Sequence, residues 1–316
     1  MRILSLVTSA HARFYRQQLA RLRARGHTVE TVAVPGRSVE DGIQFEGRTP
    51  LTYARYYPRA VAASLRDYDV VHANYGLTGP PAVVQPFHPV VLTLWGSDVM
   101  GEYAWLSRLC SRLADATVVM SEPMADAVGR DCHVIPHGVD FETFRPLPRD
   151  TAREKVGWDP DAYHVLFPYG PSRQVKNYPR AEHIVELARP ELDDRVELQT
   201  MTGLAHEEVP WYMNAADAMV LTSKREGSPN TVKEALACNC PVISVDVGDV
   251  KDRLDGATLS TAESDDELLA DALVNALRSD EDANGREVVS EIRLEHQVDR
   301  IEALLRSVSR GEVVGS

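Results

Sequence analysis

Several features that mark other protein classes are missing from this sequence. No apolar run approaches the roughly 18 residues of a membrane-spanning helix, and the amino terminus leads directly into a predicted strand. We therefore expect neither a signal peptide nor a membrane anchor. The four cysteines contain no CxxC pair, and Cys238 and Cys240 stand in an apolar context. Reduced, buried thiols in a cytoplasmic protein are the expectation.

Glycine is absent from the first 25 residues, and Gly26 follows the first predicted helix. A dinucleotide-binding fingerprint needs glycines in the turn between the first strand and the first helix. In this chain that turn, residues 8–13, reads TSAHAR. A nicotinamide-dependent dehydrogenase built on this unit is therefore disfavoured.

Positive charge is scarce in the second half of the chain. Residues 1–145 carry 15 Arg, no Lys and 14 acids, a net charge of +1, whereas residues 146–316 carry 19 basic and 33 acidic residues, a net charge of −14. No basic stripe is available there to displace phosphate counterions. We expect no nucleic-acid partner.

The first predicted helix is the exception, because it is rich in arginine. Such a basic amphipathic helix can rest on an anionic bilayer, which would place the protein peripherally at the inner membrane face. The alternative, which we favour, is an ordinary helix of an α/β domain with a solvated arginine face. The residues are Arg13, Arg16, Arg21, Arg23 and Arg25, beside Phe14, Tyr15, Leu19 and Leu22.

Short apolar runs alternate with amphipathic segments along most of the chain, which is typical of βαβ units and parallel sheets. We predict two doubly wound, Rossmann-like α/β domains facing each other across a cleft, 1–145 and 146–295, with 296–316 as a helix that packs back towards the first domain. The predicted strands are 3–7, 29–34, 70–73, 90–94, 117–120 and 134–135, then 165–167, 196–200, 218–222 and 242–245. In the helical end, Leu268, Leu269, Leu273 and Leu277 are expected to share one face, and Val298, Ile301, Leu304, Leu305 and Val308 another.

The most informative segment, residues 221–243, reads as strand, tight loop, helix and strand. Gly227 allows a close backbone approach, Ser228 is a natural N-cap, and Pro229 suits the first helical position. Free amides at such a helix start attract phosphate or sugar oxygens. Asn239 is expected to end the helix in the left-handed conformation.

Two carboxylates, Glu226 and Glu234, stand eight residues apart in this segment and can point into one groove. Glu226 precedes a helix start and has no structural task there beyond a dipole contact of about 0.3 to 1 kcal/mol. For Glu234 the alternative is a solvated helix residue paired with Lys233 or Arg253.

The segment closely resembles the donor-site signature of family 4 glycosyltransferases with the GT-B fold, which reads Glu-Gly-Ser-Pro-Asn, then Glu-Ala, then Pro-Val-Ile. This resemblance implies that Glu226 holds hydroxyls of the transferred sugar and that Glu234 bonds the ribose. It also implies that the backbone from Gly227 through Ser228, Pro229 and Asn230 to Thr231 meets the sugar and the diphosphate.

The same resemblance extends to residues 171–177, which follow the first strand of the second domain. Family members place an Arg and a Lys there on the donor diphosphate, and here these are Arg173 and Lys176. Two fixed cations stabilise the negative charge of a leaving diphosphate. They would replace a metal ion, and no carboxylate cluster indicates one. We therefore expect no metal and no cofactor, with the nucleotide sugar as co-substrate.

The first domain matches the family less closely. Residues 69–74 and 92–98 resemble its strand ends, although relatives often carry His where Asn74 and Trp95 stand. We expect His72, Asn74, Trp95 and Asp98 to line the acceptor side, with a satisfied strand-end histidine as the alternative for His72. Residues 135–140 fit the interdomain segment of the family, where we expect a hinge.

The resemblance thus implies a retaining enzyme that moves a hexosyl unit from a nucleoside diphosphate sugar to a hydroxyl of a glycan, glycolipid or small-molecule acceptor. Two alternatives share the fold, a nucleotide-sugar epimerase and a disaccharide phosphorylase. A non-catalytic nucleotide-sugar binder is the third.

Overall fold

The computed structural model describes residues 1–39, 44–46 and 48–312. The chain forms two compact units: one comprises Met1–Gly138 and the segment from Leu294 onward, and the other Val139–Arg293. The division at residue 138 lies ahead of the predicted boundary at 145, because Phe141 and Phe144 are core residues of the second unit.

A six-stranded parallel sheet in the order β2-β1-β5-β6-β7-β8 forms the centre of the first unit. Strands β1, β5, β6 and β7 are buried almost throughout, as expected for a sheet with helices on both faces. Each strand predicted in this unit is present. The bounds are β1 (Arg2–Val7), β2 (Thr28–Ala33), β5 (Val70–Asn74), β6 (Val90–Thr93), β7 (Ala116–Val119) and β8 (His133–Val134).

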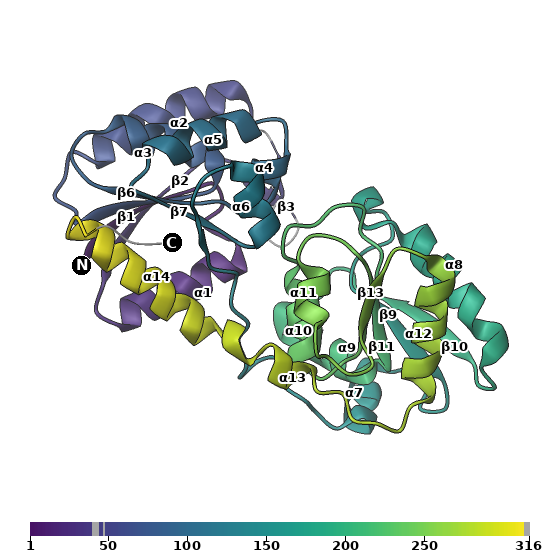
Figure 1. Cartoon of the computed structure of the whole chain (residues 1–316). Coiled ribbons are helices and arrows are strands. Elements are labelled where there is room, and N and C mark those ends of the chain that lie inside the picture. The colour runs from purple at the N-terminus through teal and green to yellow at the C-terminus, as the bar shows by residue number, and fades with distance from the viewer. Residues whose placement is uncertain (40–43, 47, 313–316) are drawn as a thin grey trace. The chain divides into compact units, whose positions relative to one another are not determined.

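Helices cover both faces of this sheet (Figure 1). Helices α2 (Pro50–Ala63), α3 (Gly79–Val84) and α5 (Ala104–Leu113) lie over one face, and α1 (Arg13–Ala24) and α14 (Leu294–Ser309) lie over the other. Shorter elements complete the unit. They are α4 (Ser97–Met100), α6 (Glu122–Val128), a 3-10 turn at Gly76–Thr78, and the antiparallel pair β3 (Arg37–Val39) and β4 (Gln44–Glu46), which the sequence pattern did not predict.

Helix α14 closes the first unit by packing on α1. Its apolar face is buried in the same core as the strands. Arg25 of α1 pairs with Asp299 at 2.6 Å and Glu302 at 2.9 Å, and Arg21 lies 3.3 Å from Glu295. Part of the arginine-rich side of α1 therefore meets acids of α14.

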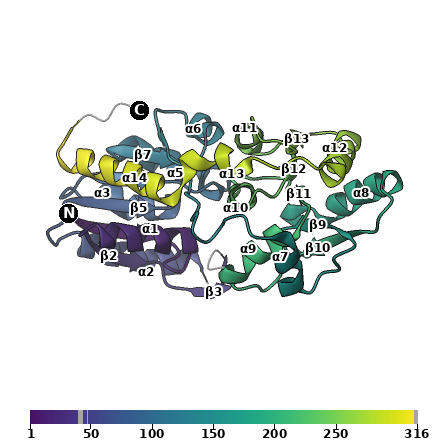
Figure 2. The same cartoon turned by 90° about the horizontal axis from the view of Figure 1, so that it is seen from below.

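The second unit contains a five-stranded parallel sheet in the order β10-β9-β11-β12-β13. Helices α8 and α12 lie on one side of it and α9, α10 and α11 on the other (Figure 2). The strands are β9 (Tyr163–Phe167), β10 (Val196–Thr200), β11 (Ala218–Leu221), β12 (Val242–Val245) and β13 (Thr261–Glu263). The helices are α7 (Arg149–Val156), α8 (Tyr178–Ala188), α9 (Val209–Ala215), α10 (Asn230–Ala237), α11 (Val250–Leu254), α12 (Asp266–Arg278) and α13 (Gly285–Val288), with 3-10 turns at Gln174–Lys176, Arg189–Glu191, His206–Glu208 and Ser290–Ile292.

One predicted helix face in this unit is wrong. Leu269, Leu273 and Leu277 are buried along α12, whereas Leu268 is 53% exposed. Positions 269, 273 and 277 are spaced by four residues and form one stripe, and Leu268 precedes that stripe by 100° of rotation. Asp265 caps the helix by accepting the amides of Glu267 and Leu268.

All four cysteines are free thiols, as predicted, and burial raises the pKa of Cys110 to about 11. No helix in the described ranges combines the length and the apolar character needed to cross a membrane.

In each sheet the strand order reverses beside the first strand, between β1 and β5 in one unit and between β9 and β11 in the other. Loops that follow two such strands diverge, and ligands of open α/β sheets bind in the gap between them. The loops after β9 and β11 are therefore the first place to look for a ligand site.

Candidate functional site

The loops after β9 and β11 bring together two predicted site residues that stand 50 positions apart in the sequence. Lys176 donates from Nζ to Oε1 of Glu226 over 2.5 Å. The two side chains are only 9% and 13% exposed. The structure thus joins the predicted cationic segment to the predicted acidic segment at the point where the strand order reverses.

The end of β11 also holds the cationic segment in place. Thr222 donates from Oγ1 to the carbonyl oxygens of Lys176 and Asn177 over 3.1 and 3.0 Å. Asn177 has a φ of +58° and turns the chain from the 3-10 turn into α8. Asparagine tolerates this left-handed conformation better than most residues. The position of Lys176 is therefore fixed by its backbone as well as by Glu226.

Tyr169, which the sequence analysis did not select, connects both segments to the start of α10. Lys176 Nζ lies 3.8 Å from the centre of the Tyr169 ring, and the guanidinium carbon of Arg173 lies 5.2 Å from it. The Tyr169 hydroxyl lies 2.9 Å from Oγ1 of Thr231. Burial, with the charge of Glu226 adding to it, raises the pKa of Tyr169, so the hydroxyl keeps its proton.

Burial lowers the pKa of Lys176, and the neighbouring Glu226 opposes that effect. A mostly buried ammonium is costly unless an anion accompanies it. Glu226 supplies that anion here. A second anion such as a diphosphate would find this cation already oriented.

Helix α10 begins differently from the prediction. It starts at Asn230, with Pro229 in the N-cap position and no side chain capping the helix. Ser228 is therefore not the N-cap; its Oγ lies 3.3 Å from Nζ of Lys233 instead. Because no side-chain acceptor takes the first amides of α10, they remain suited to an anionic ligand. Asn239 follows the helix with a φ of +57°, as predicted.

A third loop supports the backbone at Glu226. Gly248, after β12, has a φ of +63°. A Cβ atom at this position would lie 2.7 Å from the carbonyl oxygen of Gly227 and 3.1 Å from that of Glu226. Only glycine allows both this conformation and this approach.

Residues on the inner face of α10 lie beneath the loop. Glu234 is 8% exposed, which contradicts the alternative of a solvated helix residue. Lys233 is fully buried, and burial lowers its pKa to about 8. Arg253 donates from Nε to Asp249 over 2.9 Å. Charged side chains on α10 and at the start of α11 are thus largely buried within the second unit.

In the first unit, His72 and Asn74 belong to a hydrogen-bond network between strands. His72 Nε2 lies 2.8 Å from Oγ1 of Thr93, and burial lowers the pKa of His72 to about 4. Asn74 donates to Oγ of Ser5, which lies 2.7 Å from the hydroxyl of Tyr15. Both residues are 2% exposed. His72 thus has the geometry of a satisfied strand-end histidine.

Asp98 ties together the loops after β5 and β6. Its carboxylate accepts the backbone amides of Gly76, Trp95 and Gly96 at 2.8 to 3.1 Å. Burial raises the pKa of Asp98, while these amides oppose the rise. Trp95 is partly exposed and packs edge-on against Phe14, with ring centroids 4.7 Å apart. The structure brings Trp95 and Asp98 together but places His72 and Asn74 inside the sheet.

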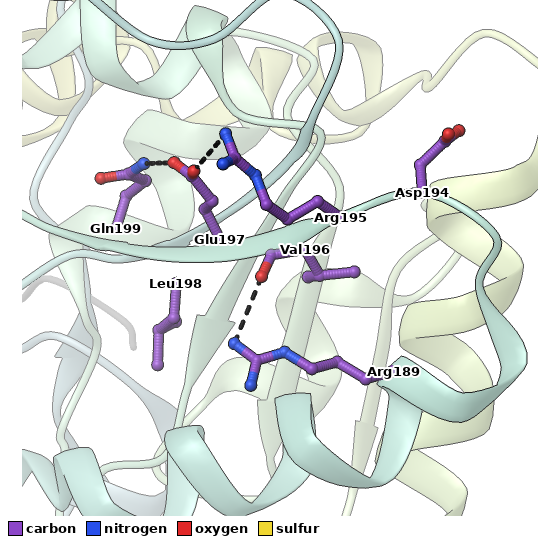
Figure 3. A pocket seen from close by; sticks show the side chains of 7 residues that line it. All are labelled: Arg189, Asp194, Arg195, Val196, Glu197, Leu198 and Gln199. Atoms are coloured by element: carbon purple, nitrogen blue, oxygen red, sulfur yellow. Dashed lines mark hydrogen bonds and ion pairs between the residues drawn. The ribbon is translucent and has the colours of Figure 1, made fainter.

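A hollow of about 550 Å³ lies elsewhere, along the edge strand β10 (Figure 3). Several of its polar side chains already have partners within the hollow: Arg195 pairs with Glu197 at 2.8 Å, Gln199 donates to Glu197, and Arg189 donates to the carbonyl of Val196. The hollow contains no predicted site residue and does not lie at the carboxyl ends of the strands. It is therefore a weaker ligand site than the loops around Glu226.

Solved structures with the same arrangement identify the fold. Sucrose-phosphate synthase from Thermosynechococcus elongatus aligns with a TM-score of 0.75 and 18% identity over 99% of this chain and 100% of that chain. The Anabaena protein HepE, solved in complex with UDP-glucose, aligns with a TM-score of 0.62 and 15% identity over 97% of this chain and 100% of that chain. The architecture is the GT-B fold, made of two doubly wound α/β units.

Family models and curated relatives make the assignment more specific. Residues 11–143 match the model described as Glycosyltransferase Family 4, and residues 168–279 match Glycosyl transferases group 1. The chain belongs to the family 4 glycosyltransferases. It is 27% identical to D-inositol 3-phosphate glycosyltransferase 1 of Catenulispora acidiphila over 58% of this chain and 57% of that protein, and 30% identical to the putative teichuronic acid biosynthesis glycosyltransferase TuaC of Bacillus subtilis over 58% and 54%. It spans about half the length of these curated relatives.

Proposed function

We propose that this protein is a retaining glycosyltransferase that moves a hexosyl unit from a nucleoside diphosphate sugar to an acceptor hydroxyl. The observation that carries the proposal is the contact of Lys176 with Glu226 where the strand order reverses. Two further facts support it: the relatives are named glycosyltransferases, and the structurally similar HepE binds UDP-glucose. Retention follows from the resemblance to family 4.

Arg173 and Lys176 bind the diphosphate in this proposal. Negative charge collects on the diphosphate as the bond to the sugar breaks, so two fixed cations in a partly buried site stabilise the transition state more than the ground state. Both cations lie against the ring of Tyr169. The two side chains take the part that a metal ion has in other transferases, and the reaction needs no metal and no further cofactor.

Glu226 accepts hydrogen bonds from hydroxyls of the transferred sugar, and the first amides of α10, together with the backbone from Gly227 to Thr231, meet the sugar and the diphosphate. Glu234, buried on the inner face of α10, bonds the ribose. When the donor enters, its diphosphate also pairs with Lys176. The contact of Lys176 with Glu226 then weakens, and the Glu226 carboxylate can turn towards the sugar.

The acceptor is a glycan, a glycolipid or a small molecule, bound by the first unit. Among the four residues predicted for this side, Trp95 is the one that is partly exposed, and we assign it the acceptor contact. Asp98 holds its loop through three amides. His72 and Asn74 support the acceptor side indirectly, through the hydrogen bonds that they form between strands. We place the reaction in the cytoplasm, where four free cysteines stay reduced.

Donor turnover tests the proposal. The protein is incubated with UDP- and GDP-hexoses, with and without acceptors or phosphate, and the nucleotide and the anomer of the product are measured with and without EDTA. We expect release of nucleoside diphosphate, a retained anomer and no effect of EDTA. Glu226→Gln and Lys176→Met should lower turnover at least about 100-fold, an effect of the size seen when a transition-state donor is lost.

Lys251→Met is the matched control, because Lys251 is an exposed lysine of the same unit. Its turnover should equal that of the unchanged protein. An epimerised sugar, a phosphate-dependent product, or donor binding with no turnover by any of these proteins would contradict the proposal and identify the alternative.

A further inference from the structure

Helix α5 carries its large apolar side chains on its exposed side. Trp105, Leu109 and Leu113 are 62%, 46% and 61% exposed. They are spaced by four residues, so they form one stripe along the helix. Most amphipathic helices of globular proteins direct such a stripe into the core.

The side of α5 that faces the domain is made mostly of small residues, with the partly buried Leu106 packed against the same core. Ala104, Ser107, Cys110 and Ser111 are buried there. This face lies very close to the start of α3, since a Cβ atom on Gly79 would lie 2.8 Å from Cβ of Cys110. The helix therefore contacts the domain mainly through its small residues, and much of its apolar stripe is exposed.

Two arginines lie between the residues of the stripe in the sequence, one directly before Leu109 and one directly before Leu113. Arg108 and Arg112 are both exposed, and among the described residues neither pairs with a carboxylate. Arg108 donates from Nε to the carbonyl of Ala127 over 2.8 Å, which directs its side chain along the surface. Residues 103–114 contain no acid, and the nearest ones, Glu102 and Asp115, flank the two ends.

We propose that the exposed face of α5 is a docking surface for an anionic lipid bilayer. Trp105, Leu109 and Leu113 enter the boundary between headgroups and acyl chains, and Arg108 and Arg112 bind lipid phosphates. A tryptophan, two leucines and interleaved arginines are the composition that such interfacial helices use. Helix α5 lies with α2 and α3 over one face of the sheet, and α1 lies over the opposite face (Figure 1).

Charge distinguishes this occupant from the others. A second copy docking through the same face would bring four arginines together, and residues 103–114 offer no acid to pair with them, which is repulsive. Helix α1, the basic helix selected from the sequence, buries Tyr15, Leu19 and Leu22 in the core and pairs Arg21 and Arg25 with α14. Helix α5 has both the apolar and the basic parts available.

Flotation with vesicles tests the surface without any donor or acceptor, so its result is independent of the proposed reaction. The full chain is mixed with vesicles of equal parts phosphatidylglycerol and phosphatidylcholine, or of phosphatidylcholine alone. We expect binding to the anionic vesicles only, weakened by salt. Replacing Trp105, Leu109 and Leu113 by Ser should lower the binding constant more than about tenfold, and R108Q with R112Q about fivefold per arginine.

Leu268→Ser is the matched control, because Leu268 is an equally exposed leucine on a helix of the other unit; its binding should not change. Thermal melts of all variants should match that of the unchanged protein. Absence of binding to anionic vesicles, equal binding by the triple variant, or a loss with Arg16→Gln on α1 as large as that with R108Q and R112Q would overturn the proposal. So would a dimer that the triple variant abolishes.

Discussion

The hydroxyl of Tyr169 lies 2.9 Å from Oγ1 of Thr231, and this contact connects the loop after β9 with the first turn of α10. The same ring lies beneath Lys176 and Arg173. Tyr169 is thus a positioning residue between the two parts of the proposed donor site.

Substitution of Tyr169 should separate the contribution of its hydroxyl, which contacts Thr231, from that of its ring, which contacts Arg173 and Lys176. Tyr169→Phe keeps the ring and loses the hydrogen bond to Thr231, and we expect nucleoside diphosphate affinity to fall about fivefold, the equivalent of about 1 kcal/mol. Tyr169→Leu also removes the cation–π contacts and should cost more than about tenfold. Calorimetric titration with UDP and GDP measures both. Wild-type affinity in both variants would show that the ring has no part in positioning.

Gly248 and Gly256 form a matched pair of glycines. Both have positive φ values, +63° and +76°, but a Cβ atom on Gly256 meets nothing within 4 Å, whereas on Gly248 it meets the Gly227 carbonyl. Gly256→Ala should cost only the conformational strain, about 1 kcal/mol. Gly248→Ala should lower the melting temperature further, and it alone should weaken donor binding. Equal donor affinity in the two variants would contradict the role of Gly248 in placing Glu226.

Asp217 forms two ion pairs in the second unit, one with a buried arginine and one with an exposed arginine. Arg153 reaches it at 2.6 Å and is 9% exposed, whereas Arg149 reaches it at 3.0 Å and is 55% exposed. Arg153→Met leaves a buried carboxylate with a weaker partner and should cost about 3 kcal/mol of unfolding free energy. Arg149→Met should change it by less than about 1 kcal/mol. Urea denaturation measures both, and equal costs would contradict this ranking.

Acid stability of the first unit should depend on Glu302. Hydrogen bonds from Arg25, with smaller contributions from Arg306 and His27, lower the pKa of Glu302 to about 2. The unfolded chain binds this proton at a higher pH, near 4.5. The stabilisation is therefore present above pH 4.5 and is lost as the pH falls towards 2.

We expect Glu302→Gln to cost about 2 kcal/mol at pH 7 and much less at pH 2.5, a value reduced from the full linkage because Arg25 is partly exposed. Melting curves across this range measure the difference. Glu295→Gln serves as the control, since Glu295 is 50% exposed and its partner lies 3.3 Å away. A constant difference between wild type and Glu302→Gln at all pH values would refute the assignment.

The sequence pattern located the strands of the two parallel sheets except β13, because a strand buried on both faces needs a continuous apolar run, which β13 lacks. It failed where helix geometry decides. Leu268 is apolar, yet it lies outside the stripe of Leu269, Leu273 and Leu277. Ser228 is a residue type that often caps helices, but Pro229 occupies the N-cap position here. The Ser228 hydroxyl contacts Lys233 instead.

In the proposed donor site, too, local patterns predicted the residues but not how they come together. Arg173, Lys176 and Glu226 were selected as separate segments, and their approach depends on the order of strands β9 and β11, which no local pattern contains. Tyr169 had only a weak signal, an aromatic residue just after a strand. The exposure of Trp105, Leu109 and Leu113 could not be predicted, because their spacing is also that of an ordinary core-facing helix.

The return of α14 to the first unit affects how the chain can fold during synthesis. Val139 and Arg293 form a bridge, so the second unit leaves and rejoins the first at one place. Residues 139–293 are continuous and can fold as soon as they leave the ribosome. Residues 1–138 emerge earlier, but their core lacks Val298, Ile301 and Leu305 until the whole second unit and α14 have also been made. The unit whose synthesis begins first is thus completed only after the second unit has been made.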